Sequence, residues 1–212
     1  MLYNCMMKLN AKQLRKGKAG RGKSKVKKQD IYIILDNVLD TYNIGSIFRL
    51  ADAVAAKKIY ICGQSEIPPN HKIKKASINT TEWVDWEYDE TAQEAIKKVR
   101  SLWDCHPKRR EGSSHLMEDS SPLQERGKLL VARNDRTGMI VAIEQSKKSI
   151  PYNQFNYSLP ICLIVGNEST GVSKEVLEMV DGIVELPMFG VNISLNVIVS
   201  LAIVLYKAME NS

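Results

Sequence analysis

The chain has 212 residues, enough for one well-buried domain, and its 44% hydrophobic and 25% charged composition is typical of a globular protein. It lacks the run of about eighteen apolar residues that a transmembrane helix needs, and no apolar segment follows its basic N-terminus. We therefore expect a cytoplasmic protein with no membrane partner and no secretory signal. Residues 1–30 hold ten Lys or Arg against one acid and are predicted to form a flexible tail that binds RNA phosphates or merely solubilises the chain.

The folded domain is predicted to span 31–212. Its first half begins with the apolar run 31–35, which is typical of a strand buried on both faces. A loop follows, then a helix with apolar residues at helical spacing from Ile44 to Ala55, and then a strand over 58–62. Residues 64–88 are expected to be rich in loops, and a helix is predicted over 90–102. The loop-rich segment contains the basic group His71, Lys72, Lys74 and Lys75.

The second half begins with a polar stretch, 103–138, which we interpret as an insertion. The elements predicted after it are strands over 139–143, 161–165 and 182–186 and helices over 172–180 and 195–209, with a stray strand over 129–132 inside the insertion. Alternating helices and solidly apolar strands indicate an α/β fold, with a mostly parallel sheet covered by helices on both faces. The last helix is apolar nearly all round, which predicts burial on more than one side and favours a homodimer.

Two patterns suggest chemistry that the sequence does not support, and a third class of enzyme lacks its motif. Cys105-His106 and His115 lack a second cysteine at ligand spacing, so we expect no metal. Residues 17–24 match the Walker A motif letter by letter, but no apolar strand precedes them and no apolar helix follows. A dinucleotide-dependent oxidoreductase is excluded because no GxGxxG motif follows the first strand.

The first candidate site motif runs from Asn43 to Arg49, where a loop becomes a helix. Asn43 is a natural N-cap, and Gly45 allows close approach of a backbone or ligand. Arg49 lies off the apolar stripe, so its guanidinium can face a phosphate or carboxylate, or simply pair with Asp52 one turn away.

Two further motifs follow buried strands. The loop GNESTG, 166–171, lies between a strand and a helix, as in a nucleotide-type pocket, although a plain tight turn has the same pattern. Glu168 in this loop disfavours phosphate and favours a cationic or hydroxylated ligand. The third motif runs from Leu186-Pro187-Met188 to Ser194-Leu195-Asn196, with Ser194 as the predicted N-cap of the last helix. Asn196 is unfavourable inside a helix unless its amide has a specific partner.

The order NxGxxxR, GNExxG, LPM and SLN resembles the SpoU branch of the SPOUT RNA methyltransferases. The resemblance covers 31–210 apart from the insertion. It implies a C-terminal trefoil knot, a homodimer joined through the last helix, and S-adenosylmethionine (SAM) as the methyl donor. The implied activity is methylation of a ribose 2′-hydroxyl in structured RNA, with tRNA favoured over rRNA.

The resemblance also assigns roles to residues of this chain. The backbone around Gly166, Leu186 and Leu195, with Ile143 from an earlier loop, would bind the adenosine part of SAM. The catalytic set would be Asn43, Arg49, Glu168, Ser194 and Asn196, and the RNA contacts would be Arg49, Lys72, Lys74 and Lys75. Arg49 is the family's proposed proton acceptor, but its pKa above about 12 makes positioning of the ribose the better physical hypothesis. We expect Arg49, Glu168 and Asn196 to converge on one pocket; the alternative is a non-catalytic RNA-binding protein on the same scaffold.

Overall fold

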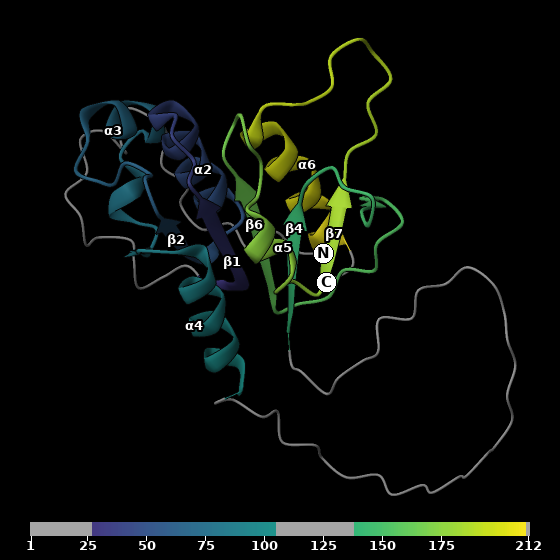
Figure 1. Ribbon diagram of the computed structural model, residues 1–212. Helices are drawn as coiled ribbons and strands as arrows, with labels where there is room; N and C mark the ends of the chain where they lie inside the picture. Colours follow the sequence, from purple (N-terminus) through teal and green to yellow (C-terminus); the bar gives the residue numbers. More distant parts are fainter. Residues whose placement is uncertain (1–26, 105–137, 211–212) are drawn as a thin grey trace, which may run out of the picture.

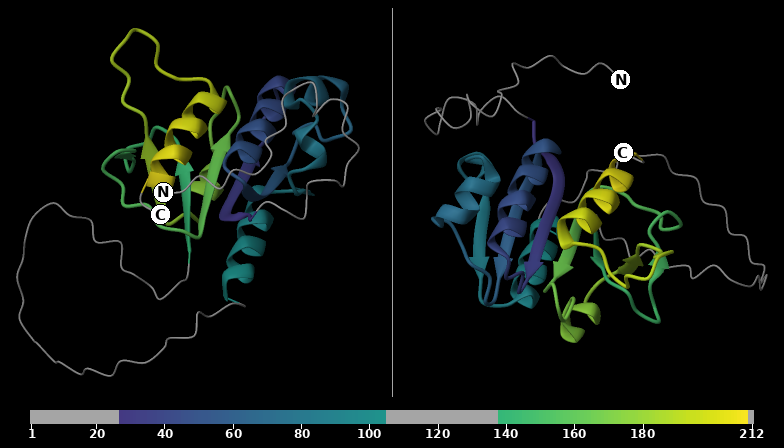
Figure 2. Two further views of the ribbon diagram at one scale, coloured as in Figure 1. Left: turned by 180° about the vertical axis from the view of Figure 1, so that it is seen from behind. Right: turned by 90° about the horizontal axis from the view of Figure 1, so that it is seen from above.

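A computed structural model of the chain describes residues 27–104 and 138–210, which form a seven-stranded sheet with helices on both faces (Figures 1 and 2). Every pair of neighbouring strands is parallel. The order across the sheet is β3-β2-β1-β6-β4-β7-β5. The strands are β1 (Gln29–Asp36), β2 (Ala56–Cys62), β3 (Trp86–Asp89), β4 (Met139–Ile143), β5 (Ile150–Pro151), β6 (Ile161–Gly166) and β7 (Gly182–Glu185). The helices are α2 (Thr41–Ala53), α3 (His71–Ser77), η1 (Thr80–Glu82), α4 (Ala92–Asp104), α5 (Lys174–Leu177) and α6 (Val197–Glu210).

The predicted parallel α/β fold is therefore confirmed, and burial explains the solid apolar strands. Successive residues of β1 point to opposite faces, so Ile33 packs toward α2 and α6 whereas Ile34 packs toward α4 and α5. Both are completely buried. Because helices cover each face, no position of a central strand faces water, and the strand needs apolar side chains throughout.

The strand order reverses direction at the centre of the sheet. From β1 the chain moves outward to β2 and β3, and after α4 it continues on the other side, where β6 pairs with β1. In such sheets the connections leave opposite faces at the reversal, and ligands bind beyond the carboxyl ends of the strands. The loops after β1, β4, β6 and β7 are consequently the place to look for a site.

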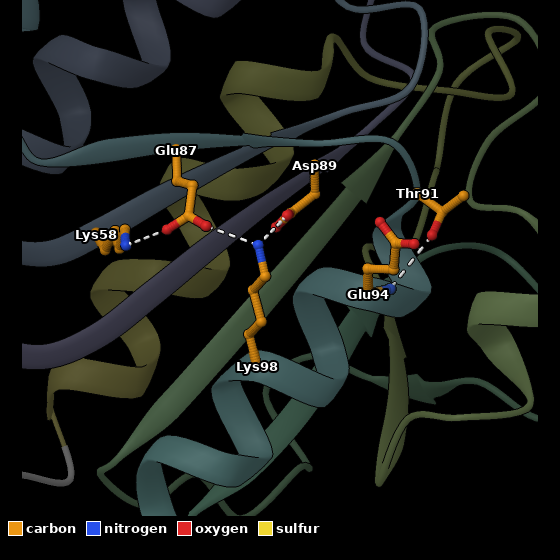
Figure 3. Close-up of polar contacts among 6 residues, drawn as sticks. All are labelled: Lys58, Glu87, Asp89, Thr91, Glu94 and Lys98. Carbon is orange, nitrogen blue, oxygen red and sulfur yellow. Dashed lines mark hydrogen bonds and ion pairs between the residues drawn. The ribbon is translucent and has the colours of Figure 1, made fainter.

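The prediction of loops over 64–88 was wrong in part, because this segment contains α3, η1 and β3. The edge strand β3 is held by charges instead of apolar packing on both faces. Glu87 on β3 pairs with Lys58 of β2 at 2.5 Å and with Lys98 of α4 at 2.6 Å, and Lys98 also pairs with Asp89 (Figure 3). Thr91 accepts a hydrogen bond from the backbone N–H of Glu94 at 3.3 Å and so caps α4.

Two predicted helix caps were also wrong. Asp40, not Asn43, caps α2, since its Oδ1 accepts from the backbone N–H of Tyr42 at 2.8 Å. The last helix begins at Val197, and its cap is Asn196, whose Oδ1 accepts from the backbone N–H of Ile198 at 2.9 Å. Ser194 lies before this helix. Asn43, predicted to be a cap, is therefore a buried residue within α2. Asn196, predicted to lie inside a helix, is the cap of α6.

Several sequence expectations concern residues outside the described ranges: most of the tail 1–30, the strand at 129–132, Cys105, His106 and His115. β1 begins at Gln29, and α4 extends to Asp104, so the predicted tail ends within β1 and the predicted insertion begins within α4. In 27–104 and 138–210, no helix has the length and apolarity needed to cross a bilayer. These same ranges contain no cluster of three His, Cys, Asp or Glu side chains that could hold a metal ion.

Candidate active site

A cavity of about 570 Å³ lies at the carboxyl edge of the sheet, where β4, β6 and β7 end. Its wall consists of the loops that follow these strands and the segment that leads into α6. The lining includes Ile143, Gly166, Glu168, Leu186, Ser194, Leu195 and Asn196. This volume lies within the range of about 300–1,000 Å³ that is usual for small-molecule sites.

The GNESTG loop is tightly folded against its neighbours. Asn167 and Gly171 exchange backbone hydrogen bonds, and Asn167 Oδ1 accepts from the backbone N–H of Ser169 at 2.8 Å. A Cβ on Gly166 would lie 2.2 Å from the backbone carbon of Gly171, so only glycine fits at this position. Gly171 itself has φ +72°, which favours glycine. The loop is thus a rigid wall that holds Glu168 in one place.

A hydrogen-bonded relay joins the three sequence motifs. Glu168 accepts from Asn43 Nδ2 at 2.9 Å, and Asn43 Oδ1 accepts from Asn196 Nδ2 at 3.1 Å. Since a carboxylate can only accept, Asn43 must turn its amide nitrogen toward Glu168, which leaves its oxygen for Asn196. Asn196 in turn uses its own oxygen to cap α6. The relay therefore fixes the GNESTG loop, the start of α2 and the start of α6 relative to one another.

Glu168 is also bonded to the loop that follows β1. Its two carboxylate oxygens accept from the backbone N–H groups of Leu39 and Asp40, each at 3.1 Å. Burial by itself would raise the pKa of Glu168, but the hydrogen bonds from Asn43 and from this backbone outweigh it and hold the pKa below its ordinary value. Glu168 is thus a carboxylate at neutral pH and a weak base.

The structure brings together most of the predicted site residues, but not all of them. Every predicted cofactor residue lines the cavity, as do Glu168, Ser194 and Asn196, and Asn43 lies behind them in the relay. The predicted RNA contacts Lys72, Lys74 and Lys75 lie on α3, outside this lining, and among the predicted catalytic residues Arg49 is the exception. It is exposed on α2, six residues beyond Asn43 and hence about 9 Å further along the helix axis. Arg49 is not among the described residues that line the cavity, so its convergence with Glu168 and Asn196, within one chain or across a dimer, stays a prediction.

Sequence reasoning missed Glu144 and Gln145, which line the cavity after β4, and Asp36, which holds a neighbouring loop at the end of β1. Glu144 follows β4, and its Oε2 accepts from the backbone N–H of Val172 at 2.8 Å. Gln145 Nε2 donates to the backbone oxygen of Ile193 at 2.8 Å and ties the segment before α6 to β4. Asp36, at the end of β1, accepts from the backbone N–H of Ser173 at 2.8 Å. Position at the carboxyl end of a predicted parallel strand was the available signal for Asp36 and Glu144.

Comparison with known proteins agrees with this architecture. Residues 30–111 and 118–206 match the SpoU rRNA Methylase family. A tRNA (guanosine(18)-2'-O)-methyltransferase from Aquifex aeolicus is 31% identical over 184 residues, which cover 87% of this chain and 71% of that protein. The chain therefore belongs to the SpoU methylase family.

Two further matches have lower sequence identity and are covered over a smaller share of their own length. A tRNA (guanosine(18)-2'-O)-methyltransferase from Escherichia coli (strain K12) is 24% identical over 185 residues, covering 85% of this chain and 63% of that protein. The crystal structure of the SpoU methyltransferase AviRb from Streptomyces viridochromogenes matches with a TM-score of 0.66 at 20% identity, over 86% of this chain and 60% of that one. The chain thus spans less than two thirds of both proteins, and the AviRb likeness concerns the fold alone.

Proposed function

We propose that the protein transfers a methyl group from SAM to a ribose 2′-hydroxyl of structured RNA, with tRNA favoured over rRNA as the substrate. The observation that carries this proposal is the meeting of three distant family motifs at one cavity, through the relay of Glu168, Asn43 and Asn196. The relatives named as tRNA (guanosine(18)-2'-O)-methyltransferases support tRNA as the substrate.

The charge of the cavity suits this methyl donor. Its lining includes the carboxylates of Glu144, Glu168 and Glu185, whereas none of the lining residues in the described part of the chain is Lys, Arg or His. SAM carries a sulfonium and an ammonium group, which such a wall attracts, while the phosphates of a nucleotide would be repelled. We infer that the backbone around Gly166, Leu186 and Leu195, with Ile143, holds the adenosine part.

SAM would supply a methyl carbon that is already electrophilic, so the protein has to align the ribose oxygen and let its proton leave. Transfer would break the C–S bond as the O–C bond forms, leave neutral S-adenosylhomocysteine, and pass the hydroxyl proton to solvent water or to the adjacent phosphate of the RNA. The polar side-chain atoms of Glu168 and Asn43 are engaged in hydrogen bonds within the protein, so we assign both residues positioning roles. Ser194 and Asn196 line the cavity and are assigned to the wall beside the ribose.

Arg49 requires a second chain in this proposal. We infer a homodimer joined through α6, in which Arg49 of one subunit reaches the cavity of the other and positions the ribose and its phosphate. An exposed apolar surface on α6 and the preceding loop supports the dimer; it comprises Phe189, Val191, Ile193, Val199 and Tyr206. The trefoil knot and a cytoplasmic location, where tRNA is found, belong to the same proposal.

The test uses the purified full-length chain with radiolabelled SAM and tRNA from cells that lack the gene. We expect label in tRNA and, after nuclease digestion, a 2′-O-methylated nucleoside by mass spectrometry. Methylation on a base instead of the ribose would contradict the proposal. Absence of SAM binding in calorimetry, with tRNA binding retained, would instead favour the non-catalytic RNA-binding alternative.

A further inference from the structure

A second cavity, of about 500 Å³, lies away from the candidate active site. It is formed by the loop before α3, by η1 and by the start of β3. Figures 1 and 2 show α2 between α3 and α6, and the two cavities share no lining residue. Its lining includes Pro68, Pro69, His71, Lys74, Glu82 and Trp86, and we refer to it as the Trp86 cavity.

The indole of Trp86 is half-buried and forms part of the cavity wall. Phe48 of α2 contacts it nearly perpendicularly, with ring centroids 6.5 Å apart and an angle of 84° between the ring planes. A perpendicular contact covers at most one face of the indole, so Phe48 supports the ring without by itself blocking a base from stacking on it. Pro68 and Pro69 supply further apolar surface.

Polar groups on the rim have the charges that a nucleotide needs. His71 and Lys74 line the cavity and are exposed, and Lys72 and Lys75 project from the same short helix into solvent. These side chains can contact phosphates. Glu82, also in the lining, can accept from the amino group of a base or from a ribose hydroxyl. An aromatic platform bordered by cations is the usual way in which proteins bind unpaired nucleotides of RNA.

We propose that the Trp86 cavity binds an unpaired nucleotide of the RNA substrate, with its base stacked on Trp86 and its phosphate beside His71 and Lys74. This inference rests on the proposed function, because it assumes that RNA is the substrate. β3 is three strands away from β6 in the sheet, about 14 Å measured across the strands, and Trp86 lies at the level of Leu163, three residues before Gly166. A short single-stranded segment spans that distance, so the cavity selects RNA whose target ribose has an unpaired neighbour nearby.

The test compares variants of the full-length chain in binding to tRNA from cells that lack the gene, measured by fluorescence anisotropy at several salt concentrations. Trp86→Leu should weaken binding at least about fivefold without changing the salt dependence, because stacking is lost but no charge is. Trp86→Phe should bind like the wild type. Lys74→Ala should lower the slope of log Kd against log salt by about 1.

Lys97→Ala is the matched control, since Lys97 is an exposed lysine of α4 on the opposite face of the sheet; it should bind tRNA like the wild type. All variants should retain wild-type affinity for SAM in calorimetry, which establishes that they are folded. Wild-type tRNA affinity in both Trp86→Leu and Lys74→Ala, with methylation by the wild type intact, would overturn this inference alone. A wild-type chain that neither binds nor methylates tRNA would overturn the proposed function as well.

Discussion

At the scale of single residues, Asn43 has the most constrained side chain of the site. It is 6% exposed, and its two amide atoms face different partners, Glu168 and Asn196. The acceptor-only carboxylate determines the orientation of both amides in turn. Glu168 therefore orients Asn43 and, through it, Asn196. The hydrogen-bond donors around Glu168 lower its pKa.

Asn43→Asp should turn the relay into a repulsive pair. The new carboxylate would face Glu168, so one of the two acids should have a raised pKa. A raised pKa in the folded state means that stability falls as pH rises through it. We expect a loss of about 2 kcal/mol in the free energy of unfolding at pH 7, partly recovered at pH 5, in urea titrations. Asn43→Ala is the control, and an equal pH dependence in both variants would contradict this explanation.

Glu168→Gln should reveal the pH range in which the carboxylate stabilises the fold. The folded pKa is lowered, so its contribution is complete above the unfolded pKa of about 4.3 and is lost as pH falls through the folded value. The difference in free energy of unfolding between wild type and variant should be constant from pH 6 to 8 and shrink below about pH 4.3. A difference that shrinks between pH 6 and 8 would instead mean that Glu168 titrates as a base near neutral pH.

At the scale of elements, the strands that are buried on both faces could be predicted from the sequence. The elements that depend on contacts with other elements could not. Apolar runs that alternate with helices are typical of strands buried in a sheet, and they predicted five of the strands: β1, β2, β4, β6 and β7. The edge strand β3 is half-buried and charged, so it has no such run. β5 has only two residues, Ile150 and Pro151, too few for any pattern. α3 depends on its packing against α2, where a Cβ on Gly45 would lie 2.6 Å from that of Ala76.

The site was predicted in the same uneven way. Its loops could be predicted because they follow parallel strands and carry the family motifs. The roles of Asn43 and Asn196 could not, because asparagine suits a helix cap locally, whereas the bonds that join Asn43 to Glu168 and to Asn196 come from distant parts of the chain. The position of Arg49 relative to the cavity depends on tertiary and quaternary structure, which helical spacing does not contain.

Gly171→Ala should destabilise the loop that carries Glu168. The residue has φ +72°, and its Cβ would lie 2.1 Å from Glu144 Oε2, the acceptor for the backbone N–H of Val172. We expect a loss of about 2 kcal/mol or more in urea unfolding and weaker SAM binding in calorimetry. Gly190→Ala is the matched control, because a Cβ there meets nothing within 4 Å, and its effect should stay within about 0.5 kcal/mol. Equal effects of the two substitutions would show that the close approach at Gly171 is unimportant.

At the scale of the whole molecule, two features of the chain support the proposed dimer. Phe189 and Val191 are 95% and 101% exposed beside the cavity, and Val199 and Tyr206 leave an apolar stripe open on α6. Contiguous apolar surface of this kind usually marks an interface. Arg49 is the other feature, since it does not line the cavity of its own chain. A twofold dimer would bury the apolar surface and can bring Arg49 of one subunit to the other's cavity.

The dimer can be tested by replacing an exposed residue of its proposed interface. Val199 is 43% exposed on α6, so Val199→Glu should leave the fold of the chain intact while placing a charge in the interface. We expect the wild type to sediment as a dimer and Val199→Glu as a monomer with little methylation activity. Lys97→Glu, an exposed change on α4, is the control and should remain dimeric. A monomeric wild type that methylates tRNA would contradict the dimer.

Mixing two inactive variants tests whether Arg49 acts across the dimer. Arg49→Ala and Asn196→Ala should each abolish most activity as homodimers. In a mixed dimer, the Arg49→Ala subunit keeps an intact Asn196, and its partner supplies an intact Arg49, so one of the two sites is complete. Co-refolded equal amounts should therefore recover about a quarter of wild-type activity, because half of the dimers are mixed and each has one working site. If Arg49 serves its own subunit, every mixed site lacks one residue and no activity returns, an outcome that would exclude action across the dimer.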